Sequence, residues 1–171
     1  GDCHVFNHKQ ICADDLVDTD ILLVRSTTKV HQALLSKASR LKFVSTATAG
    51  TNHLDIDYLT KRGIAYSSAA GCNATAVAEY VISVLFASAE KLASNLLDKT
   101  VAIIGAGQVG TRLSEKLSAL GINYVLCDPP LAEQGDKRHF VSLEQALQAD
   151  IITLHTPLVE QGSHPTRHLI N

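Results

Sequence analysis

The sequence predicts an α/β protein built from doubly wound parallel sheets. Short apolar runs typical of buried strands alternate with segments of helical periodicity along most of the chain. Such units favour right-handed crossovers between parallel neighbouring strands. One strand is followed by Gly105, Gly107 and Gly110, whose G-x-G-x-x-G spacing is typical of a dinucleotide-binding turn.

The composition is that of a globular chain with one large or two small domains. Its 171 residues are 46% hydrophobic and carry a net charge of −2. The near-neutral balance and the absence of a Lys/Arg cluster argue against nucleic acid or an anionic membrane as a partner. No apolar run approaches the roughly 18 residues of a membrane span and no signal-peptide pattern occurs. We therefore expect a cytoplasmic protein.

The first part of the chain is predicted as three strands with intervening helices. In chain order we expect a strand at 20–25, a helix at 31–41 carrying Leu34, Leu35 and Leu41, a strand at 42–46, a helix at 54–62 ended by Gly63, and a strand at 64–66. Polar loops containing Ser26 and Thr48 follow the first two strands. Because ligands bind beyond the carboxyl ends of parallel strands, both loops are predicted at a ligand-binding edge.

A long helix is predicted at 74–92, with Asn73 as its N-cap. Its apolar face is expected to carry Val77, Val81, Leu85 and Phe86. A helix of this length between two sets of strands suits a connector between domains. We therefore predict three parts, a first domain at 1–73, a connector helix and linker at 74–98, and a second domain at 99–171.

The glycine-rich segment from Val101 to Thr111 organises the second domain. Gly105 permits the tight turn out of the strand, Gly107 lets the backbone approach a pyrophosphate, and Gly110 lets the new helix pack closely on the strand. The anion would bind the free N–H groups at the start of that helix, where the macrodipole is positive.

An acidic residue follows at the position where such folds bind ribose. The helix carrying Val109, Leu113, Leu117 and Leu120 is ended by Gly121, and a strand at 124–127 then leads to Asp128. The Asp128 carboxylate can accept hydrogen bonds from the adenosine ribose and would repel a 2′-phosphate, which favours NAD over NADP. The alternative is that Asp128 only opens the turn made with Pro129 and Pro130. A helix at 143–148 and a strand at 151–154 complete the predicted elements.

No metal site is predicted. Cys3, Cys12, Cys72 and Cys127 lack metal-ligand spacing, so reduced thiols are expected. His4 and His8 have helical spacing without a second pair nearby, which favours solvated histidines.

Five segments carry a resemblance to a known family. They are Val-Arg-Ser-Thr-Thr-Lys-Val (24–30), Thr-Ala-Thr-Ala-Gly-Thr-Asn-His-Leu-Asp (46–55), Gly-Cys-Asn-Ala-Thr-Ala-Val-Ala-Glu-Tyr-Val (71–81), Leu-Cys-Asp-Pro-Pro (126–130) and His-Thr-Pro-Leu (155–158). From about Asp20 onward the chain resembles the D-isomer-specific 2-hydroxyacid dehydrogenases. The first of these segments and the double proline after Asp128 indicate a narrower group within them.

The resemblance implies a flavodoxin-like substrate domain and a Rossmann NAD-binding domain, with the active site in the cleft between them. It also implies NAD-linked oxidation of the 2-hydroxyl of a phosphorylated four-carbon sugar acid by a homodimer. Both domains would be incomplete in this chain, which is expected to be a piece of a longer protein.

By position, the resemblance implies roles for individual residues. Ser26 and Thr48 are expected to contact the substrate, although Ser26 can also be read as a turn-forming serine. Gln108 and Val109 would meet the cofactor pyrophosphate through their backbone, Asp128 the adenosine ribose, and Thr156 the cofactor near the end of a strand.

The resemblance also implies a catalytic Arg, His and Glu, which are expected beyond Asn171. No catalytic residue is therefore predicted within the chain. His53 and His155 lie in ligand-side loops but lack an obvious orienting carboxylate, so neither is predicted as the general base. Asp55 and Glu79 are read as capping or surface acids.

Two other functions stay open. One is another D-2-hydroxyacid dehydrogenase, such as a phosphoglycerate dehydrogenase. The other is an NAD-sensing protein that has the fold without catalysis.

Overall fold

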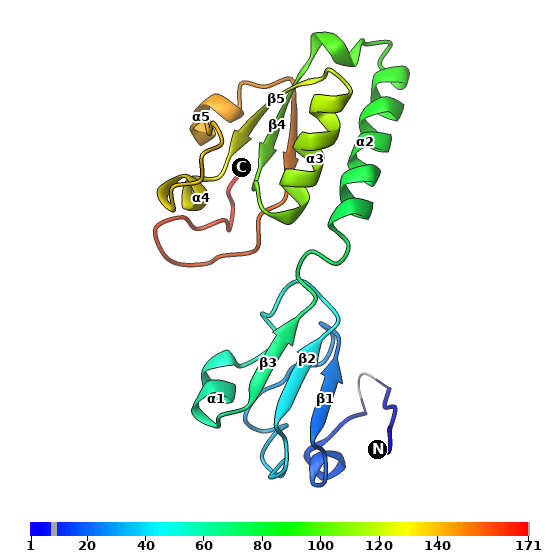
Figure 1. The fold of residues 1–171 in the computed structure, drawn as a ribbon, viewed down its shortest axis with the longest axis vertical. Coiled ribbons are helices and arrows are strands. Elements are labelled where there is room, and N and C mark those ends of the chain that lie inside the picture. The colour runs from blue at the N-terminus through cyan, green and yellow to red at the C-terminus, as the bar shows by residue number, and fades with distance from the viewer. Residues whose placement is uncertain (8–9, 171) are drawn as a thin grey trace. The chain divides into compact units, whose positions relative to one another are not determined.

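The computed structural model describes residues 1–7 and 10–170 and divides the chain into two compact units, Gly1–Cys72 and Asn73–Asn171 (Figure 1). Each unit contains its own three-stranded sheet, and all the strand pairs within both sheets are parallel. The predicted parallel α/β class is therefore confirmed. His8 lies outside the described residues.

The first unit is built on strands β1 (Ile21–Val24), β2 (Phe43–Thr46) and β3 (Ala65–Ser68), paired in the order β1-β2-β3. A 3₁₀ helix, η1 (Ala13–Leu16), precedes them, and α1 (Ile56–Lys61) contacts β3. Apolar side chains from strands, loops and α1 form one core, including Leu22, Leu35, Val44 and Leu59. The three predicted strands of this unit are confirmed.

Helix α1 begins two residues later than predicted, because the preceding residues are bonded elsewhere. The Val30 N–H donates to the His53 carbonyl at 2.7 Å, and the Asp55 N–H donates to the Val30 carbonyl at 2.9 Å. The Asp55 carboxylate then accepts from the Tyr58 N–H at 3.0 Å as the N-cap of α1. The capping role predicted for Asp55 is confirmed.

The helix predicted at 31–41 is wrong, since the segment forms a series of turns. Its apolar residues are buried as expected, with Leu35 and Ala38 fully enclosed. The backbone carbonyls are satisfied differently, because the Arg62 guanidinium donates to the Leu35 carbonyl at 2.9 Å and to the Ala38 carbonyl at 2.8 Å. Apolar spacing therefore predicted the buried face correctly, but not the backbone that presents it.

The second unit is built on β4 (Thr100–Ile104), β5 (Asn123–Cys127) and β6 (Ile151–Leu154), in the order β5-β4-β6. Its helices are α2 (Ala74–Lys91), η2 (Leu96–Asp98), α3 (Gln108–Ala119), α4 (Pro129–Glu133) and α5 (Leu143–Ala146). The predicted helices and strands of this part of the chain are confirmed, with α5 two residues shorter at its end. Helix α4 and η2 were not predicted.

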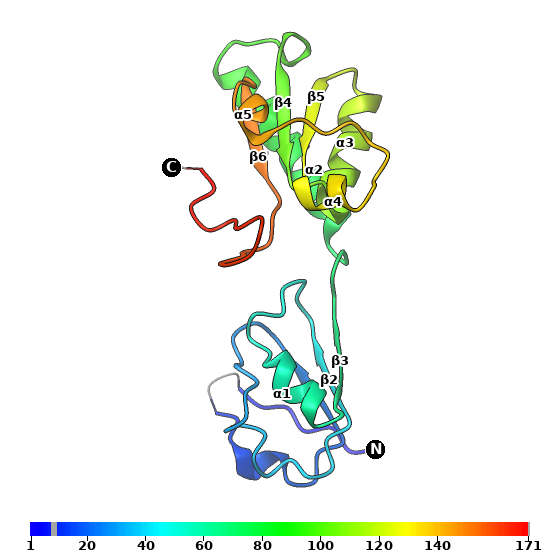
Figure 2. The same cartoon turned by 90° about the vertical axis from the view of Figure 1, so that its left-hand side faces the viewer.

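Strand β4 is buried on both faces, so the second unit has three layers. Val101 and Ile103 pack into the core shared with α2 and α3, whereas Ala102 and Ile104 pack into a second core with Ala146 of α5. Figures 1 and 2 show α2 and α3 on one side of the sheet and α5 on the other. Alternate side chains of β4 therefore point to different helix layers.

The buried face of α2 agrees only in part with the predicted one, since Leu85 is buried and Val81 packs against the core but Phe86 does not. Ala74, Ala78, Leu85 and Ala89 are buried, Val77 and Val81 are half-buried, and Phe86 is 50% exposed. Alanines at the contact let α2 approach α3 closely, and Lys116 of α3 forms an ion pair with Glu79 of α2 at 3.1 Å. Asn73 occupies the N-cap position, but its side chain accepts no hydrogen bond there. Glu79 is the surface acid that the sequence predicted.

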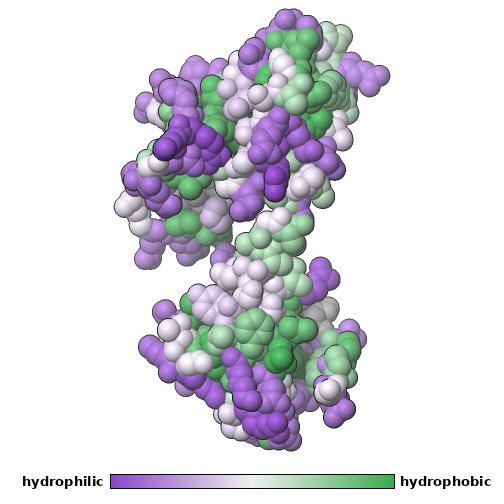
Figure 3. Space-filling view, viewed as in Figure 1, coloured by the Kyte–Doolittle hydropathy of each residue, from purple (hydrophilic) through white to green (hydrophobic). Residues whose placement is uncertain are grey.

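Exposed apolar side chains gather around the C-terminal end of α2, where Figure 3 shows hydrophobic surface. Phe86, Leu97 and Leu120 line a shallow groove there with Leu96 and Ile122. The groove lies at the amino ends of β4 and β5, the opposite sheet edge from the glycine turn.

Candidate functional site

The strand order of the second unit creates a switch point beside β4. The chain passes from β4 to β5 on one side and later returns to β6 on the other. In such sheets, ligands bind beyond the carboxyl ends of the strands where the order reverses. The turn Gly105–Gly110 follows β4, Asp128 follows β5, and His155 and Thr156 follow β6. All seven predicted cofactor residues therefore lie in segments at the same edge of this sheet.

Gly105 and Gly110 are required by close backbone approaches. Gly105 has φ +94°, and a Cβ there would lie 2.7 Å from the His155 carbonyl carbon and 2.9 Å from the Thr156 nitrogen. A Cβ at Gly110 would lie 2.2 Å from the Gly105 carbonyl oxygen. These distances forbid a side chain, so both glycines keep α3 and β6 close to the turn.

Gly107 differs, because a Cβ there would meet nothing within 4 Å. It is the N-cap of α3 and is followed by Gln108, which is exposed, and Val109, which is half-buried. In the described part of the chain no side chain caps this helix, and its first turn contains no acid. Among the described residues the first N–H groups of α3 therefore have no side-chain acceptor, and the positive end of the helix dipole favours an anion there.

Asp128 links β5 to the glycine turn. Its Oδ2 accepts from the Ala106 N–H at 2.8 Å, and its Oδ1 accepts from the Leu131 N–H at 3.1 Å as the N-cap of α4. The alternative interpretation, a turn opened with Pro129 and Pro130, thus describes part of its structural role. A carboxylate has about four lone-pair sites, which leaves acceptor capacity for hydroxyl groups. Asp128 is half-buried and remains accessible for that.

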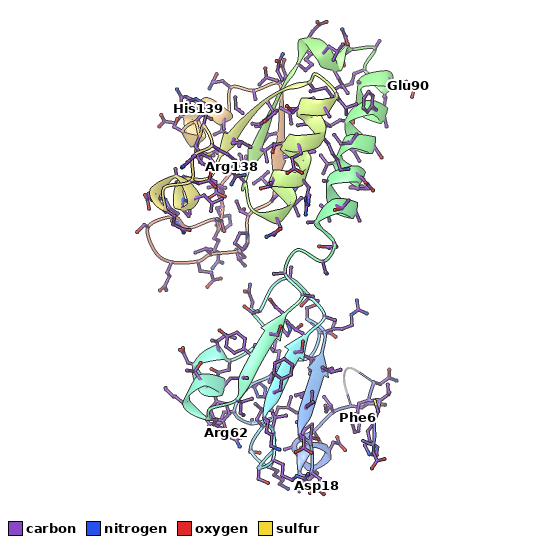
Figure 4. All side chains as sticks on the ribbon, viewed as in Figure 1. Phe6, Asp18, Arg62, Glu90, Arg138 and His139 are labelled. Atoms are coloured by element: carbon purple, nitrogen blue, oxygen red, sulfur yellow. The ribbon has the colours of Figure 1, made fainter. Side chains whose placement is uncertain are left out.

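Arg138 reaches the same turn, and no sequence pattern predicted this contact. Its Nη1 donates to the Ala106 carbonyl at 3.0 Å and to Thr111 Oγ1 at 2.9 Å. The residue belongs to an irregular segment between α4 and α5, where no motif or periodicity marks a contact (Figure 4).

The predicted substrate residues belong to the first unit. Ser26 and Thr48 lie in the loops after β1 and β2, which the Ala47 N–H joins by donating to the Val24 carbonyl at 2.9 Å. Ser26 is exposed and Thr48 is half-buried. Both therefore lie at the carboxyl edge of this sheet, as expected from the parallel arrangement.

A small polar network supports Thr48. Its Oγ1 lies 2.9 Å from the buried Thr46 Oγ1, which in turn lies 2.8 Å from His53 Nε2, and Thr48 Oγ1 also donates to the Gly50 carbonyl at 3.1 Å. Burial lowers the pKa of His53 below its usual value of 6.5, so the neutral ring is favoured.

His155 resembles His53 in its environment. Its Nε2 lies 3.0 Å from Thr153 Oγ1, and burial lowers its pKa below 6.5. Neither histidine has a carboxylate partner among the hydrogen bonds of residues 1–7 and 10–170. Their contacts with threonine hydroxyls give each ring a structural partner.

The cysteines are free thiols, as predicted, with Cys127 buried and the other three exposed. Among the residues that the structure describes, no three His, Cys, Asp or Glu side chains converge as metal ligands. Of the helices in these residues, none combines the length and the hydropathy that a bilayer-spanning segment needs.

The chain is similar to known proteins along its whole length. It is 58% identical over 171 residues to the erythronate-4-phosphate dehydrogenase of Pseudoalteromonas atlantica, covering 100% of this chain and 46% of that protein. It is 50% identical over 171 residues to the enzyme of the same name from Psychromonas ingrahamii, covering 100% of this chain and 45% of that protein. The chain thus spans about half the length of the curated relatives it matches.

Among solved structures, the NAD⁺-bound 3-phosphoglycerate dehydrogenase of Entamoeba histolytica superimposes with a TM-score of 0.74 at 26% identity, covering 91% of this chain and 52% of that one. Residues 2–156 match the family described as D-isomer specific 2-hydroxyacid dehydrogenase, catalytic domain. This match extends over most of the chain and agrees with the parallel sheets and the glycine turn. The chain therefore belongs to the D-isomer-specific 2-hydroxyacid dehydrogenase family.

Proposed function

We propose that the protein containing this chain is an NAD-dependent dehydrogenase that oxidises the 2-hydroxyl of 4-phospho-D-erythronate, a step in pyridoxal phosphate biosynthesis. The names of the two relatives described above support the substrate, and the family supports the reaction class. The observation that carries the cofactor assignment is the uncapped start of α3, beside a Gly107 with open space where a side chain would stand.

The residues present suit a dinucleotide. Gln108 and Val109 would donate backbone N–H groups to the pyrophosphate, and Asp128 would accept from the adenosine ribose hydroxyls. Because Gly105, Gly107 and Gly110 have no side chains, the backbone of the turn can come close to the pyrophosphate. Thr156 follows β6 and lies beside the same turn. When bound, NAD supplies the hydride acceptor.

In this proposal residues 1–73 bind the substrate and residues 74–98 connect the two domains. Residues 99–171 form the beginning of the NAD-binding domain. Ser26 and Thr48 would hold substrate oxygens from the edge of β1 and β2. The general base and its partners would come from outside this chain, because among the described residues neither His53 nor His155 hydrogen-bonds to a carboxylate that would orient it.

We also propose a cytoplasmic homodimer. The four free thiols support a reducing compartment. The family resemblance supports the dimer, and the net charge of −2 supports small-molecule rather than nucleic-acid or membrane partners.

A steady-state assay of the full-length protein tests the proposal. NADH formation from NAD and 4-phospho-D-erythronate is expected, with 3-phosphoglycerate and D-lactate as comparison substrates. Turnover of 3-phosphoglycerate without turnover of 4-phospho-D-erythronate would instead support a phosphoglycerate dehydrogenase, which the structural similarity also favours. NAD binding without turnover of any hydroxy acid would support the NAD-sensing alternative.

A further inference from the structure

Arg138 is a charged residue that hydrogen-bonds directly to the glycine turn. Arg138 has five side-chain N–H donors, and two of them are on Nη1. One donates to the Ala106 carbonyl of the turn (3.0 Å) and the other to Thr111 Oγ1 of α3 (2.9 Å). Thr111 Oγ1 also donates to the Ala106 carbonyl at 3.1 Å. The carbonyl of this fully buried alanine therefore accepts from two side chains.

The same alanine is held from its other side. The Ala106 N–H donates to Asp128 Oδ2 at 2.8 Å, whereas the sheet ladder ends one residue earlier, where the Gly105 N–H donates to the Cys127 carbonyl at 2.9 Å. Side chains thus fix both polar groups of Ala106, directly before the N-cap Gly107. The position of that peptide decides where the first N–H groups of α3 point.

Arg138 is itself fixed by a second set of contacts. Its Nε donates to Asp136 Oδ1 at 3.0 Å and its Nη2 to Asp136 Oδ2 at 2.7 Å, a bidentate pair. The Phe140 ring lies under the guanidinium, 5.4 Å from the ring centroid to the Arg138 Cζ. The hydrogen bonds from Arg138 hold the pKa of Asp136 at about 2, so the carboxylate is charged at neutral pH.

These contacts use four of the five N–H donors of Arg138 within the protein, which leaves little capacity for a ligand. Its action on a ligand must therefore pass through the turn. A turn that is already fixed lowers the entropic cost of binding, because fewer groups become ordered when the ligand arrives.

We propose that Arg138, oriented by Asp136, is a positioning residue for NAD, which holds the Ala106 peptide so that the N–H groups at the start of α3 meet the pyrophosphate. The inference rests on the proposed NAD site and assigns Arg138 no contact with NAD.

The test measures NAD binding by calorimetry and both KM values in the full-length protein and in Arg138→Ala. The dissociation constant and the KM for NAD should rise roughly tenfold, the size expected for one charge-assisted hydrogen bond. The KM for the hydroxy acid and kcat at saturating NAD should stay within twofold. Arg138→Lys should recover part of the loss, since an ammonium can still reach the Ala106 carbonyl but cannot also form the bidentate pair.

Two further variants keep the result interpretable. Asp136→Asn retains the guanidinium but weakens its orientation, and should raise the NAD dissociation constant less than Arg138→Ala does. Arg112→Ala removes an exposed arginine of α3 that pairs with Glu115 at 3.7 Å, and should leave NAD binding unchanged. If Arg138→Ala does not fold, Asp136→Asn and Arg138→Lys supply the comparison.

Unchanged NAD binding in these variants, with normal NAD binding by the unaltered protein, would overturn the positioning role alone. Equal losses for NAD and the hydroxy acid would also overturn it, because they would indicate a general structural defect. Failure of the unaltered protein to bind NAD would overturn the proposed function as well.

Discussion

The backbones of Gly105 and Gly110 approach so closely that a Cβ on Gly110 would lie 2.2 Å from the Gly105 carbonyl oxygen. Both groups belong to the backbone of one turn, so neither can move aside as a flexible side chain would. The start of α3 is therefore packed directly on the end of β4. The same approach fixes the geometry of the candidate pyrophosphate site.

Gly110→Ala should accordingly destabilise the second unit by about 1–3 kcal/mol, since the new methyl group overlaps the backbone. Gly107→Ala is the matched control, because φ there is −68° and a Cβ meets nothing within 4 Å. It should leave the urea midpoint nearly unchanged but weaken NAD binding, as its methyl group enters the space assigned to the pyrophosphate. Equal stability of the two variants would contradict this account of Gly110.

Asp128→Asn should reduce the preference for NAD over NADP. The neutral amide no longer repels a 2′-phosphate, and a unit charge at about 4 Å near a protein surface is worth several kcal/mol. We expect the ratio of kcat/KM for NAD to that for NADP to fall on the order of tenfold or more. Glu144→Gln, at an exposed acid in the first turn of α5, should leave the ratio unchanged. An unaltered ratio in Asp128→Asn would argue that the carboxylate serves only the turn and α4.

Arg62→Ala should destabilise the first unit by roughly 1–3 kcal/mol, because the Leu35 and Ala38 carbonyls lose their side-chain donor. Lys61→Ala removes a neighbouring exposed cation at the end of α1 and should have little effect. Chemical denaturation of both variants checks the difference. Similar midpoints would mean that the turns at 31–41 are held by apolar burial alone.

Stability should fall as the pH drops below about 6.5, through His53. Burial lowers its pKa in the folded protein below the unfolded value of 6.5, so the unfolded chain binds more protons between these two values. Stability therefore rises with pH across that window and levels off above it. His53→Gln should flatten part of this dependence in urea titrations between pH 5 and 8. A variant with the same slope as the unaltered protein would show that His53 does not titrate in this way.

Most of the strands were predictable because they contain a short apolar run that ends in polar or glycine residues. Val101–Ile104 is the clearest case, since burial on both faces gives a continuous apolar run without alternation. The candidate cofactor edge followed from this pattern, because parallel strands bring their carboxyl ends together. Residues far apart in the sequence, such as Gly105 and Thr156, are neighbours for that reason.

The remaining features depend on contacts that no local pattern records. The segment 31–41 has helical apolar spacing, but Arg62 satisfies carbonyls that a helix would have used. The buried face of α2 depends on its contact with α3. Alanines are buried at that contact, whereas Val77 and Val81 are half-buried and Phe86 is exposed. Arg138 reaches the glycine turn from 32 residues away along the chain.

The buried Cys127 at the end of β5 gives this chain an internal reporter of opening. Its side chain is 1% exposed, and burial raises its thiol pKa above the usual 9.0, so the reactive thiolate is scarce in the closed state. A thiol reagent should modify the exposed Cys3, Cys12 and Cys72 at once and Cys127 only when β5 separates from β4. The slow phase of labelling would then measure how often the strand that leads to Asp128 detaches, without any introduced probe.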